Sequence, residues 1–300
     1  RGFSPSLICG SCGELLKCPN CSVSLTLHRS AGESLQCHYC DYSVAVPKTC
    51  AKCHAARLTE EGSGTERIEA TLKQALPTAR VARLDRDVAA GAKSEAVLDR
   101  VRAGEVDILV GTQMVTKGHD LPNVTLVGVL NADSALSMPD FRASERTFQL
   151  LVQVAGRAGR GDTPGRVLIQ TRQPEHPAIA YAVLHDVPGF IERELRDREE
   201  VRFPPFTRLA LVRFDALDEG QALAECERVA AIARGAAPSG VEVLGPTAAP
   251  LARLRNRYRF RFVLRAVERK PLRDALLAVA RASVSRLVRV AIDVDPVNML

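Results

Sequence analysis

Eight of the nine cysteines of this chain lie within its first 53 residues, and all eight occur in Cys-x-x-Cys pairs. A Cys-x-x-Cys turn places two thiolates about one tetrahedral edge apart, so two such pairs can close a four-cysteine zinc site. The alternative is a disulfide-bonded or redox-active segment, but nothing in the sequence indicates secretion. The array therefore predicts two bound Zn²⁺ ions. The pairs are Cys9/Cys12, Cys18/Cys21, Cys37/Cys40 and Cys50/Cys53.

The spacers between the pairs, which are five, fifteen and nine residues long, indicate which pairs share a metal. Fifteen residues suit a zinc-ribbon hairpin, with alternating apolar residues at 23, 25 and 27, a turn near Ala31-Gly32 and Leu35 on the return strand. The inner pairs then close one site, and the closed hairpin returns the outer pairs to a second, nested site. The predicted sites are Cys9, Cys12, Cys50 and Cys53 for one metal, and Cys18, Cys21, Cys37 and Cys40 for the other.

A second arrangement, with the first two pairs on one metal, is the alternative, and it leaves the fifteen-residue hairpin unclosed. The spacing favours nesting over this arrangement. Three histidines lie close enough to be considered as ligands, but eight thiolates already fill two tetrahedral sites. They are His28, His38 and His54.

Length and composition fit an intracellular protein of several parts. A chain of 300 residues that is 46% hydrophobic can bury a sizeable core, and it suggests two domains beside the metal module. Apolar runs such as 124–130 have the length of a strand, so no membrane span is expected. The chain begins Arg1-Gly2 with neither an initiator Met nor a signal-peptide pattern, which predicts a fragment or a processed piece.

Beyond the cysteines, predicted strands and helices alternate, as in an α/β domain with a parallel sheet. Ser63-Gly64-Thr65-Glu66 has the form of a capping box that opens a helix ending near Pro77. Ligands of such sheets gather at loops beyond the carboxyl ends of the strands. The remaining elements are expected as strands at 80–84, 107–110, 124–130 and 166–171 and helices at 93–101 and 141–154.

Two polar runs follow elements of this domain, at 111–120 and 153–161. In the second run, Arg157 and Arg160 stand three residues apart among glycines, so two guanidinium groups can approach one polyphosphate. A glycine-rich turn with solvated arginines is the alternative. The first run offers Thr112, Gln113 and Lys117, whose hydroxyl, amide and ammonium groups suit a sugar-phosphate backbone.

These runs resemble motifs V and VI of the second RecA-like lobe of superfamily 2 helicases. Together with the stretch 140–146 and the four Cys-x-x-Cys pairs, they resemble the primosomal replication-restart helicases of the PriA family over essentially the whole chain. The resemblance implies an α/β, RecA-like second helicase lobe with an inserted two-zinc module and a small α+β carboxyl-terminal domain. The implied boundaries are 9–54 for the module, 1–8 with 55–203 for the lobe, and 204–300 for the last domain.

The resemblance also implies roles for single residues. Arg157 and Arg160 match arginine fingers that reach the phosphates of ATP from across the lobe interface, and Gln153 matches the glutamine that couples nucleotide to lobe closure. A DNA strand would be held by the residues of the first polar run, with His119 added to them. Near the nucleotide cleft, the matched residues are Gly64, Thr65 and Glu66.

These 300 residues contain neither a Gly-x-x-x-x-Gly-Lys-Ser/Thr phosphate loop nor an Asp-Glu-x-His box. The chain alone is therefore expected not to hydrolyse ATP, and ATP with Mg²⁺ would be shared with a first lobe. The alternative is a non-catalytic, zinc-dependent scaffold that binds DNA and partners while retaining helicase geometry.

A domain boundary is expected near 202–206, where two prolines end a helical stretch. Beyond it, strands are expected at 208–216 and 241–244 and a helix at 219–234. Between residues 253 and 265, Arg255, Arg257, Arg259 and Arg261 alternate with mostly apolar residues, so a strand there would carry a basic face. The family reading assigns such a face to forked DNA and to the acidic tail of single-strand DNA-binding protein, in a bacterial cytoplasmic, nucleoid-associated primosome. A solvated strand face is the alternative.

Overall fold

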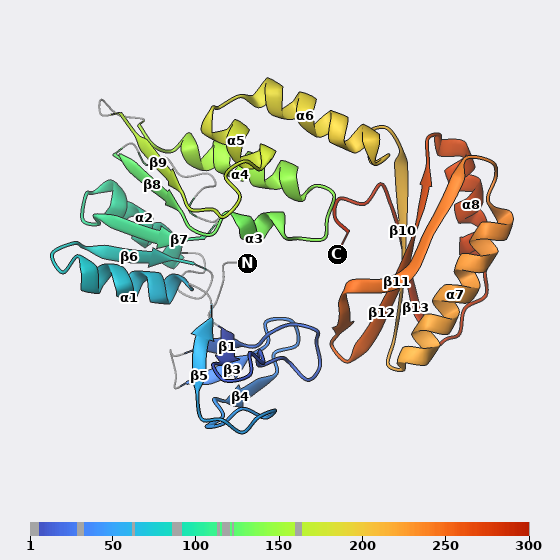
Figure 1. Cartoon of the computed structure of the whole chain (residues 1–300), viewed down its shortest axis with the longest axis horizontal. Helices are drawn as coiled ribbons and strands as arrows, with labels where there is room; N and C mark the ends of the chain where they lie inside the picture. The colour runs from blue at the N-terminus through green and yellow to red at the C-terminus, as the bar shows by residue number, and fades with distance from the viewer. Residues whose placement is uncertain are drawn as a thin grey trace.

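A computed structural model of the chain describes residues 6–28, 33–61, 64–85, 92–112, 115, 121, 123–159 and 164–299. From the amino terminus onward, these residues form a cysteine-rich module, an α/β lobe and an α+β carboxyl-terminal part (Figure 1). The fold class predicted from the sequence is confirmed.

Two antiparallel strands join the cysteine-rich module to the lobe. β1 (Ser6–Cys9) pairs with β5 (Leu58–Glu61), so the two ends of the module lie side by side. The ribbon hairpin pairs β2 (Thr26–His28) with β3 (Ser34–Gln36), with Leu27 opposite Leu35. Both leucines are buried. A third strand that the sequence pattern does not predict, β4 (Ser43–Ala45), pairs with β3, and the predicted turn at 31–32 lies outside the described residues.

The lobe contains two pairs of parallel strands with helices against them. Leu84 and Leu98 are buried in a cluster at the first pair, where apolar residues of strand and helix meet. The predicted capping box at the start of the first helix is wrong. Gly64 is the N-cap without a side-chain capping bond, and Glu66 instead pairs with Arg83 at 3.0 Å, while Ser63 lies outside the described residues. The elements are β6 (Val81–Leu84) with β7 (Ile108–Gly111), β8 (Leu126–Val129) with β9 (Arg166–Ile169), α1 (Thr65–Ala75) and α2 (Ala92–Arg102).

The rest of the lobe is a small helical layer that the sequence pattern only partly predicts. Phe148 and Phe190 stack with ring centroids 3.9 Å apart, which joins the fourth helix to the sixth. Asp186 caps the sixth helix by accepting from the N–H of Gly189 at 2.9 Å. These helices are α3 (Asp133–Leu136), α4 (Ala143–Ala155), α5 (Pro177–Val183) and α6 (Val187–Glu200).

The carboxyl-terminal part is a four-stranded antiparallel sheet in the order β11-β12-β10-β13, with two helices packed on it. Phe214, Phe262 and Cys226 are completely buried between the sheet and these helices. The strand alternation places arginines on the opposite face. The elements are β10 (Arg208–Ala216), α7 (Glu219–Ala236), β11 (Val241–Leu254), β12 (Arg257–Ala266), α8 (Arg269–Arg281) and β13 (Arg289–Val294).

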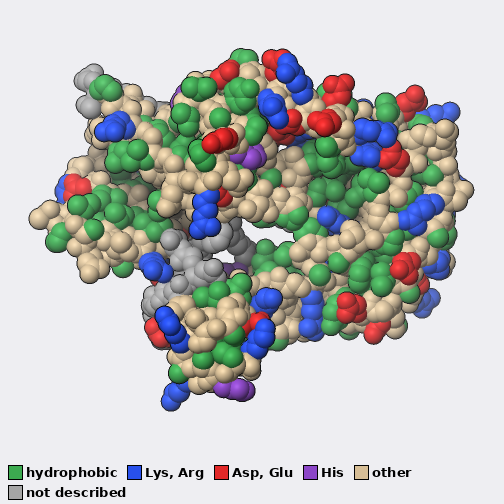
Figure 2. All heavy atoms as spheres, viewed as in Figure 1, with side chains coloured by type: hydrophobic (Ala, Val, Ile, Leu, Met, Phe, Trp, Pro, Cys, Tyr) green, Lys and Arg blue, Asp and Glu red, His purple; other side chains and the backbone are tan. Residues whose placement is uncertain are grey.

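The three parts surround an opening in the space-filling view, and arginine and lysine side chains are spread over all of them (Figure 2). Several contacts between described residues connect the carboxyl-terminal part to the rest. Arg265 of β12 donates to the carbonyl of Val201 at 3.0 Å, and Arg202 pairs with Glu242 of β11. The turn between β11 and β12 meets the ribbon, and residues 297–299 lie against the start of α4. None of the described helices is long and apolar enough to cross a membrane.

Candidate metal centres and nucleic-acid interface

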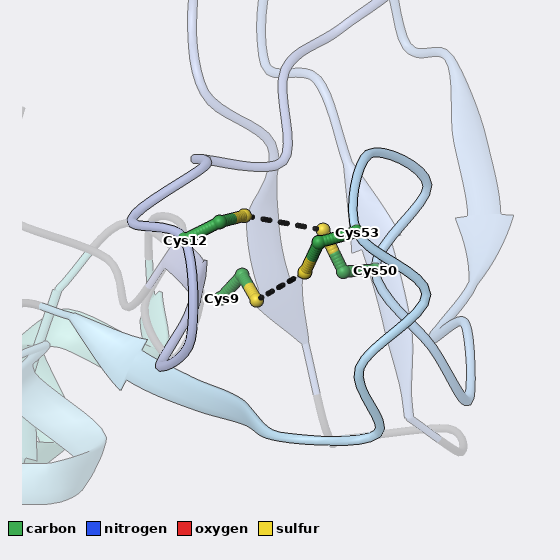
Figure 3. A group of neighbouring side chains, drawn as sticks. All are labelled: Cys9, Cys12, Cys50 and Cys53. Carbon is green, nitrogen blue, oxygen red and sulfur yellow. Dashed lines mark hydrogen bonds between the residues drawn. The ribbon is translucent and has the colours of Figure 1, made fainter.

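The outer cluster consists of Cys9, Cys12, Cys50 and Cys53 (Figure 3). The pairing of Cys9 with Leu58 across β1 and β5 brings the first and last cysteine pairs together. The sulfurs of Cys9 and Cys53 are 3.5 Å apart, and those of Cys12 and Cys50 are 3.7 Å apart. Cys9 and Cys50 are buried, whereas Cys12 and Cys53 are exposed.

The inner cluster consists of Cys18, Cys21, Cys37 and Cys40, at the base of the ribbon hairpin. The sulfurs of Cys18 and Cys40 are 3.6 Å apart. Apart from the half-buried Cys40, the cysteines of this cluster are buried, and they lie against a small core that includes Leu35. The structure thus brings the eight sulfurs together in the two groups that the spacing favours.

The separations of the sulfurs fit metal coordination and not disulfides. With a Zn–S bond of about 2.3 Å, the edge of a tetrahedron of sulfurs is about 3.8 Å. A disulfide would bring two sulfurs to about 2.05 Å. None of the nine cysteines forms a disulfide, and in each cluster the four sulfurs lie within 4.8 Å of one another. Each set of four thiols therefore fits a closed, structural zinc site.

Hydrogen bonds and burial act in opposite directions on the thiols. The backbone N–H groups of Cys12 and Ser11 lower the pKa of Cys9 to about 6, which favours its thiolate at neutral pH. Burial raises the pKa of Cys21 to about 12. A bound cation would offset that burial penalty, because zinc is coordinated by the thiolate.

In the lobe, Thr65 and Glu66 lie at the start of α1 and are engaged within the lobe. The Thr65 hydroxyl donates to the buried carboxylate of Asp85 at 2.5 Å, and Arg83 contacts both Glu66 and Asp85. Gly64, the third residue predicted for the nucleotide cleft, is buried at the N-cap. These three residues thus lie together around the amino end of one helix.

Gln153 and Arg157 lie near the end of α4, where Gln153 is exposed and Arg157 is half-buried. The following turn is tight. Gly159 has φ +75°, and a Cβ added there would lie 2.6 Å from the backbone nitrogen of Gly165. Glycine therefore permits both the left-handed conformation and the close approach of the chain.

Of the other predicted residues of the two polar runs, Thr112 is half-buried after β7, while Gln113, Lys117, His119 and Arg160 lie outside the described residues.

The second candidate site is the arginine face, which is the side of the carboxyl-terminal sheet opposite its helices. Register places Arg213 opposite Arg261 and Asp215 opposite Arg259. Burial, together with the nearby Arg213, lowers the pKa of Arg259. The guanidinium of Arg257 is engaged by Asp215, and the face retains an excess of positive charge. A groove of about 520 Å³ on this face is lined by Arg213, Asp215, Leu217, Leu254, Arg255, Arg257, Arg259, Arg289 and Ala291.

The alternation predicted for the basic stripe holds from Arg257 onward and is wrong for Arg255. Arg255 and Asn256 form the turn between β11 and β12, with φ of 50° and 63°, so Arg255 does not lie on a strand. Its guanidinium donates to the carbonyl of Tyr39 in the ribbon at 2.6 Å. Sequence reasoning missed Arg213 and Arg289. Arg213 lies within the predicted strand 208–216, but only the cross-strand register brings it beside Arg259 and Arg261.

Three family profiles match the chain. The "PriA DNA helicase Cys-rich region (CRR) domain" matches residues 18–44, the "Helicase conserved C-terminal domain" matches residues 57–162, and the "Primosomal protein N C-terminal domain" matches residues 199–297. The first profile covers the inner cluster and the ribbon sheet. The second includes α4 and Arg157, and the third includes the arginine face.

Curated relatives match over most or all of the chain. Replication restart protein PriA of Bacillus subtilis is 41% identical over 306 residues, which is 100% of this chain and 38% of that protein. Its namesake in Haemophilus influenzae is 38% identical over 302 residues, covering 100% of this chain and 41% of the relative. The PriA protein of Synechocystis is 41% identical over 269 residues, which is 88% of this chain and 32% of that protein. The chain spans less than half of the length of these relatives, and it matches their carboxyl-terminal part. The chain belongs to the PriA family of replication restart proteins.

Proposed function

We propose that this chain is the carboxyl-terminal part of an ATP-dependent DNA helicase that binds forked DNA and promotes reloading of the replicative helicase at stalled forks. The observation that carries the proposal is the joint presence of a helicase lobe, two four-cysteine clusters and a basic face in one chain that is about 40% identical to named replication restart proteins. The proposed division is 1–8 with 55–203 for the lobe, 9–54 for the module and 204–300 for the last domain. The proposed location is the bacterial cytoplasm, on the nucleoid.

The eight clustered cysteines are the proposed ligands of two Zn²⁺ ions. Separations of 3.5 to 3.7 Å between paired sulfurs support this assignment. Each ion would be coordinatively closed by four thiolates, so its proposed role is to hold the module in shape and not to take part in a reaction.

Arg157 and Arg160 are the proposed contacts to the phosphates of ATP. The ATP would be held by a first helicase lobe outside the 300 residues of this chain. Arg157 lies two residues beyond the end of α4, on a turn that allows close approach of the backbone. Guanidinium groups placed this way stabilise charge on a transferring phosphoryl group when the lobes close. ATP with Mg²⁺ supplies the phosphoryl chemistry when bound. Gln153 would couple nucleotide to closure, and the amino end of α1 with Gly64, Thr65 and Glu66 would face the cleft.

DNA would contact two surfaces. The first is the segment that follows β7 in the sequence, with Thr112, Gln113, Lys117 and His119. The second is the arginine face, where Arg257 and Arg259 are proposed phosphate contacts. Contacts to phosphates carry no sequence information, which suits a protein that acts at arbitrary forks. The same excess of positive charge suits the acidic tail of single-strand DNA-binding protein, and other primosome proteins are further proposed partners.

DNA-stimulated ATP hydrolysis by the full-length protein tests the enzymatic proposal. Arg157→Ala is expected to lower the rate by about 10³ to 10⁵ because it removes a finger. The matched control is Arg100→Ala, since Arg100 is an exposed arginine of the same lobe. Unchanged turnover in Arg157→Ala would refute the finger assignment.

Salt-dependent DNA binding tests the arginine face. Arg259→Ala is expected to weaken binding of forked DNA alike for unrelated sequences, and to reduce the salt slope by about 1. Arg273→Ala, on the exposed side of α8, is the control. Equal slopes for the two variants would remove this face from the DNA-binding surface.

The alternative function is a non-catalytic, zinc-dependent scaffold that binds DNA and partners. The two four-cysteine clusters and the arginine face support it equally, because neither feature requires ATP. Full-length protein that binds forked DNA with Arg259-dependent affinity, yet hydrolyses no ATP, would establish the scaffold.

A further inference from the structure

The turn between β11 and β12 contacts the ribbon through paired backbone groups. Ser22 donates its N–H to the carbonyl of Arg253 at 2.7 Å, and the N–H of Arg253 donates to the Ser22 hydroxyl at 2.9 Å. The N–H of Asn256 donates to the carbonyl of Asn20 at 2.9 Å. The partners on the ribbon lie in and beside one Cys-x-x-Cys turn, so this contact is made directly at the inner cluster.

Backbone conformation makes this turn unusual. Arg255 and Asn256 both have positive φ, at 50° and 63°, as in the two-residue type I′ hairpin loop. Glycine and asparagine favour these angles, whereas arginine does not. A disfavoured conformation persists when surrounding contacts determine it. Here it turns the N–H groups of both residues toward the ribbon.

One of those N–H groups reaches a sulfur of the inner cluster. Arg255 donates its backbone N–H to Sγ of Cys21 at 3.2 Å. Its guanidinium donates to the carbonyl of Tyr39, the residue before Cys40. The guanidinium of Arg253 donates to the carbonyl of Pro19, which lies between Cys18 and Cys21. Two cationic side chains and one N–H of the carboxyl-terminal part thus lie at a group of four thiols.

The charges of these groups favour the metal-bound form of the inner cluster. Four thiolates around one Zn²⁺ carry a net charge of about −2, since each thiolate contributes one negative charge. Nearby arginines and N–H donors favour that charge, and hydrogen bonds to metal ligands commonly change metal affinity. Without the metal, the four sulfurs are no longer held at one centre, so the Arg255 N–H and the two guanidinium groups lose the fixed arrangement that they contact.

The outer cluster has no such partner among the interactions that join described residues. Its neighbours come from the module itself, where the N–H of Lys52 donates to Sγ of Cys50 at 3.4 Å and the Lys52 side chain pairs with Glu14 at 3.2 Å. The two clusters therefore differ in their dependence on the carboxyl-terminal part, and the outer cluster serves as an internal control.

We infer that the turn 253–256 positions the ligands of the inner zinc site, so that metal in this site and docking of the carboxyl-terminal part stabilise each other. Coupling of two binding equilibria is reciprocal. Removal of the metal weakens docking, and loss of docking weakens retention of the metal. The inference rests on zinc binding by the inner cluster and not on the proposed ATPase, so the two can fail separately.

Residue-resolved thiol labelling of the full, zinc-loaded chain tests the first direction. The chain is incubated with a chelator and N-ethylmaleimide, and peptide mass spectrometry gives the alkylation rate of each cysteine. Arg253→Glu, which places a negative charge beside Pro19, is expected to release the inner cysteines about 10-fold faster and to leave the outer cysteines unchanged. Ser22→Ala is a milder second variant with a smaller effect of the same pattern. Arg273→Glu, an equal charge change on α8, is the control.

Equal rates for the inner cysteines in the parent chain and in both docking variants would overturn the inference. So would equal acceleration in both clusters, because that pattern indicates general loosening of the module. Asn256→Gly preserves the N–H and suits a φ of 63°, so it should retain the slow release of the parent chain.

Hydrogen exchange tests the reciprocal direction. The amide of Asn256 donates to the ribbon carbonyl of Asn20, so its protection should fall when zinc is removed. Amides of β10 that pair with β12, such as those near Phe214, should keep their protection. Unchanged protection of the turn after metal removal would refute reciprocity.

Discussion

The backbone N–H of Met299 donates to Oδ2 of Asp140, 159 residues earlier in the chain, at 3.3 Å. The Asp140 side chain is only 1% exposed, and the same oxygen also accepts from the guanidinium of Arg146 at 3.0 Å. Arg142 and Arg146 both donate to the carbonyl of Val297. A segment at the far end of the sequence is therefore held against the start of α4, the helix that leads to Arg157.

Asp140→Asn is expected to destabilise the chain. Oδ2 accepts two donors and Oδ1 accepts the N–H of Arg142, so an amide nitrogen in either place leaves a donor without an acceptor. A buried donor left unsatisfied costs about 1 to 3 kcal/mol. Urea unfolding of the full chain measures the loss. The matched control, Asp99→Asn, breaks an exposed pair with Arg102 and should change stability by less than about 0.5 kcal/mol.

Zinc content is expected to separate the two clusters. Cys9→Ser should lower the content from about two ions per chain to about one, because one four-thiolate site loses a ligand. Alkylation should then increase at Cys12, Cys50 and Cys53 alone. Cys226→Ala, outside both clusters, should keep both ions. Increased alkylation at Cys18 and Cys21 in the Cys9 variant would instead favour the sequential arrangement of pairs.

Cys226 makes a further prediction about alkaline pH. Burial raises the pKa of this thiol to about 12, whereas an unfolded cysteine titrates near its ordinary value of about 8.5. The unfolded state therefore loses its proton first, and its ionisation favours unfolding as the pH rises above about 9. The contribution reaches at most about 1.4 kcal/mol per pH unit. Cys226→Ala should flatten the alkaline fall in unfolding free energy, and parallel pH profiles for the two chains would contradict the assignment.

What the sequence predicts best is local. Leu27 and Leu35 are eight residues apart, and their pairing follows from a short hairpin closed by cysteines. The strand 208–216 is predicted with its observed bounds because a mostly apolar run follows the proline pair 204–205 and ends just before the polar residues 218–219. In each case, the information lies within about twenty residues of chain, where periodicity and turn spacing determine the structure.

The predictions from the sequence are wrong where residues far away in the chain determine the local conformation. Alternation assigned Arg255 to a strand face, but contact with a cysteine turn 234 residues earlier holds it in a left-handed turn. The motif at 63–66 predicted a capping box, yet Glu66 is drawn to Arg83 on the neighbouring strand. Nothing near Asp140 indicates that it holds the backbone of Met299. Tertiary partners override local preference at each of these residues.

The distance along the chain between the ribbon and its docking turn bears on synthesis. All four thiols of the inner cluster fall between residues 18 and 40, so the nascent segment can take up metal soon after it leaves the ribosome. Arg255, whose N–H reaches Cys21, is translated 234 residues later. The last domain therefore docks on a ribbon that has already folded. In a cell short of zinc, the ribbon would lack its metal, and the last domain would have no folded surface on which to dock.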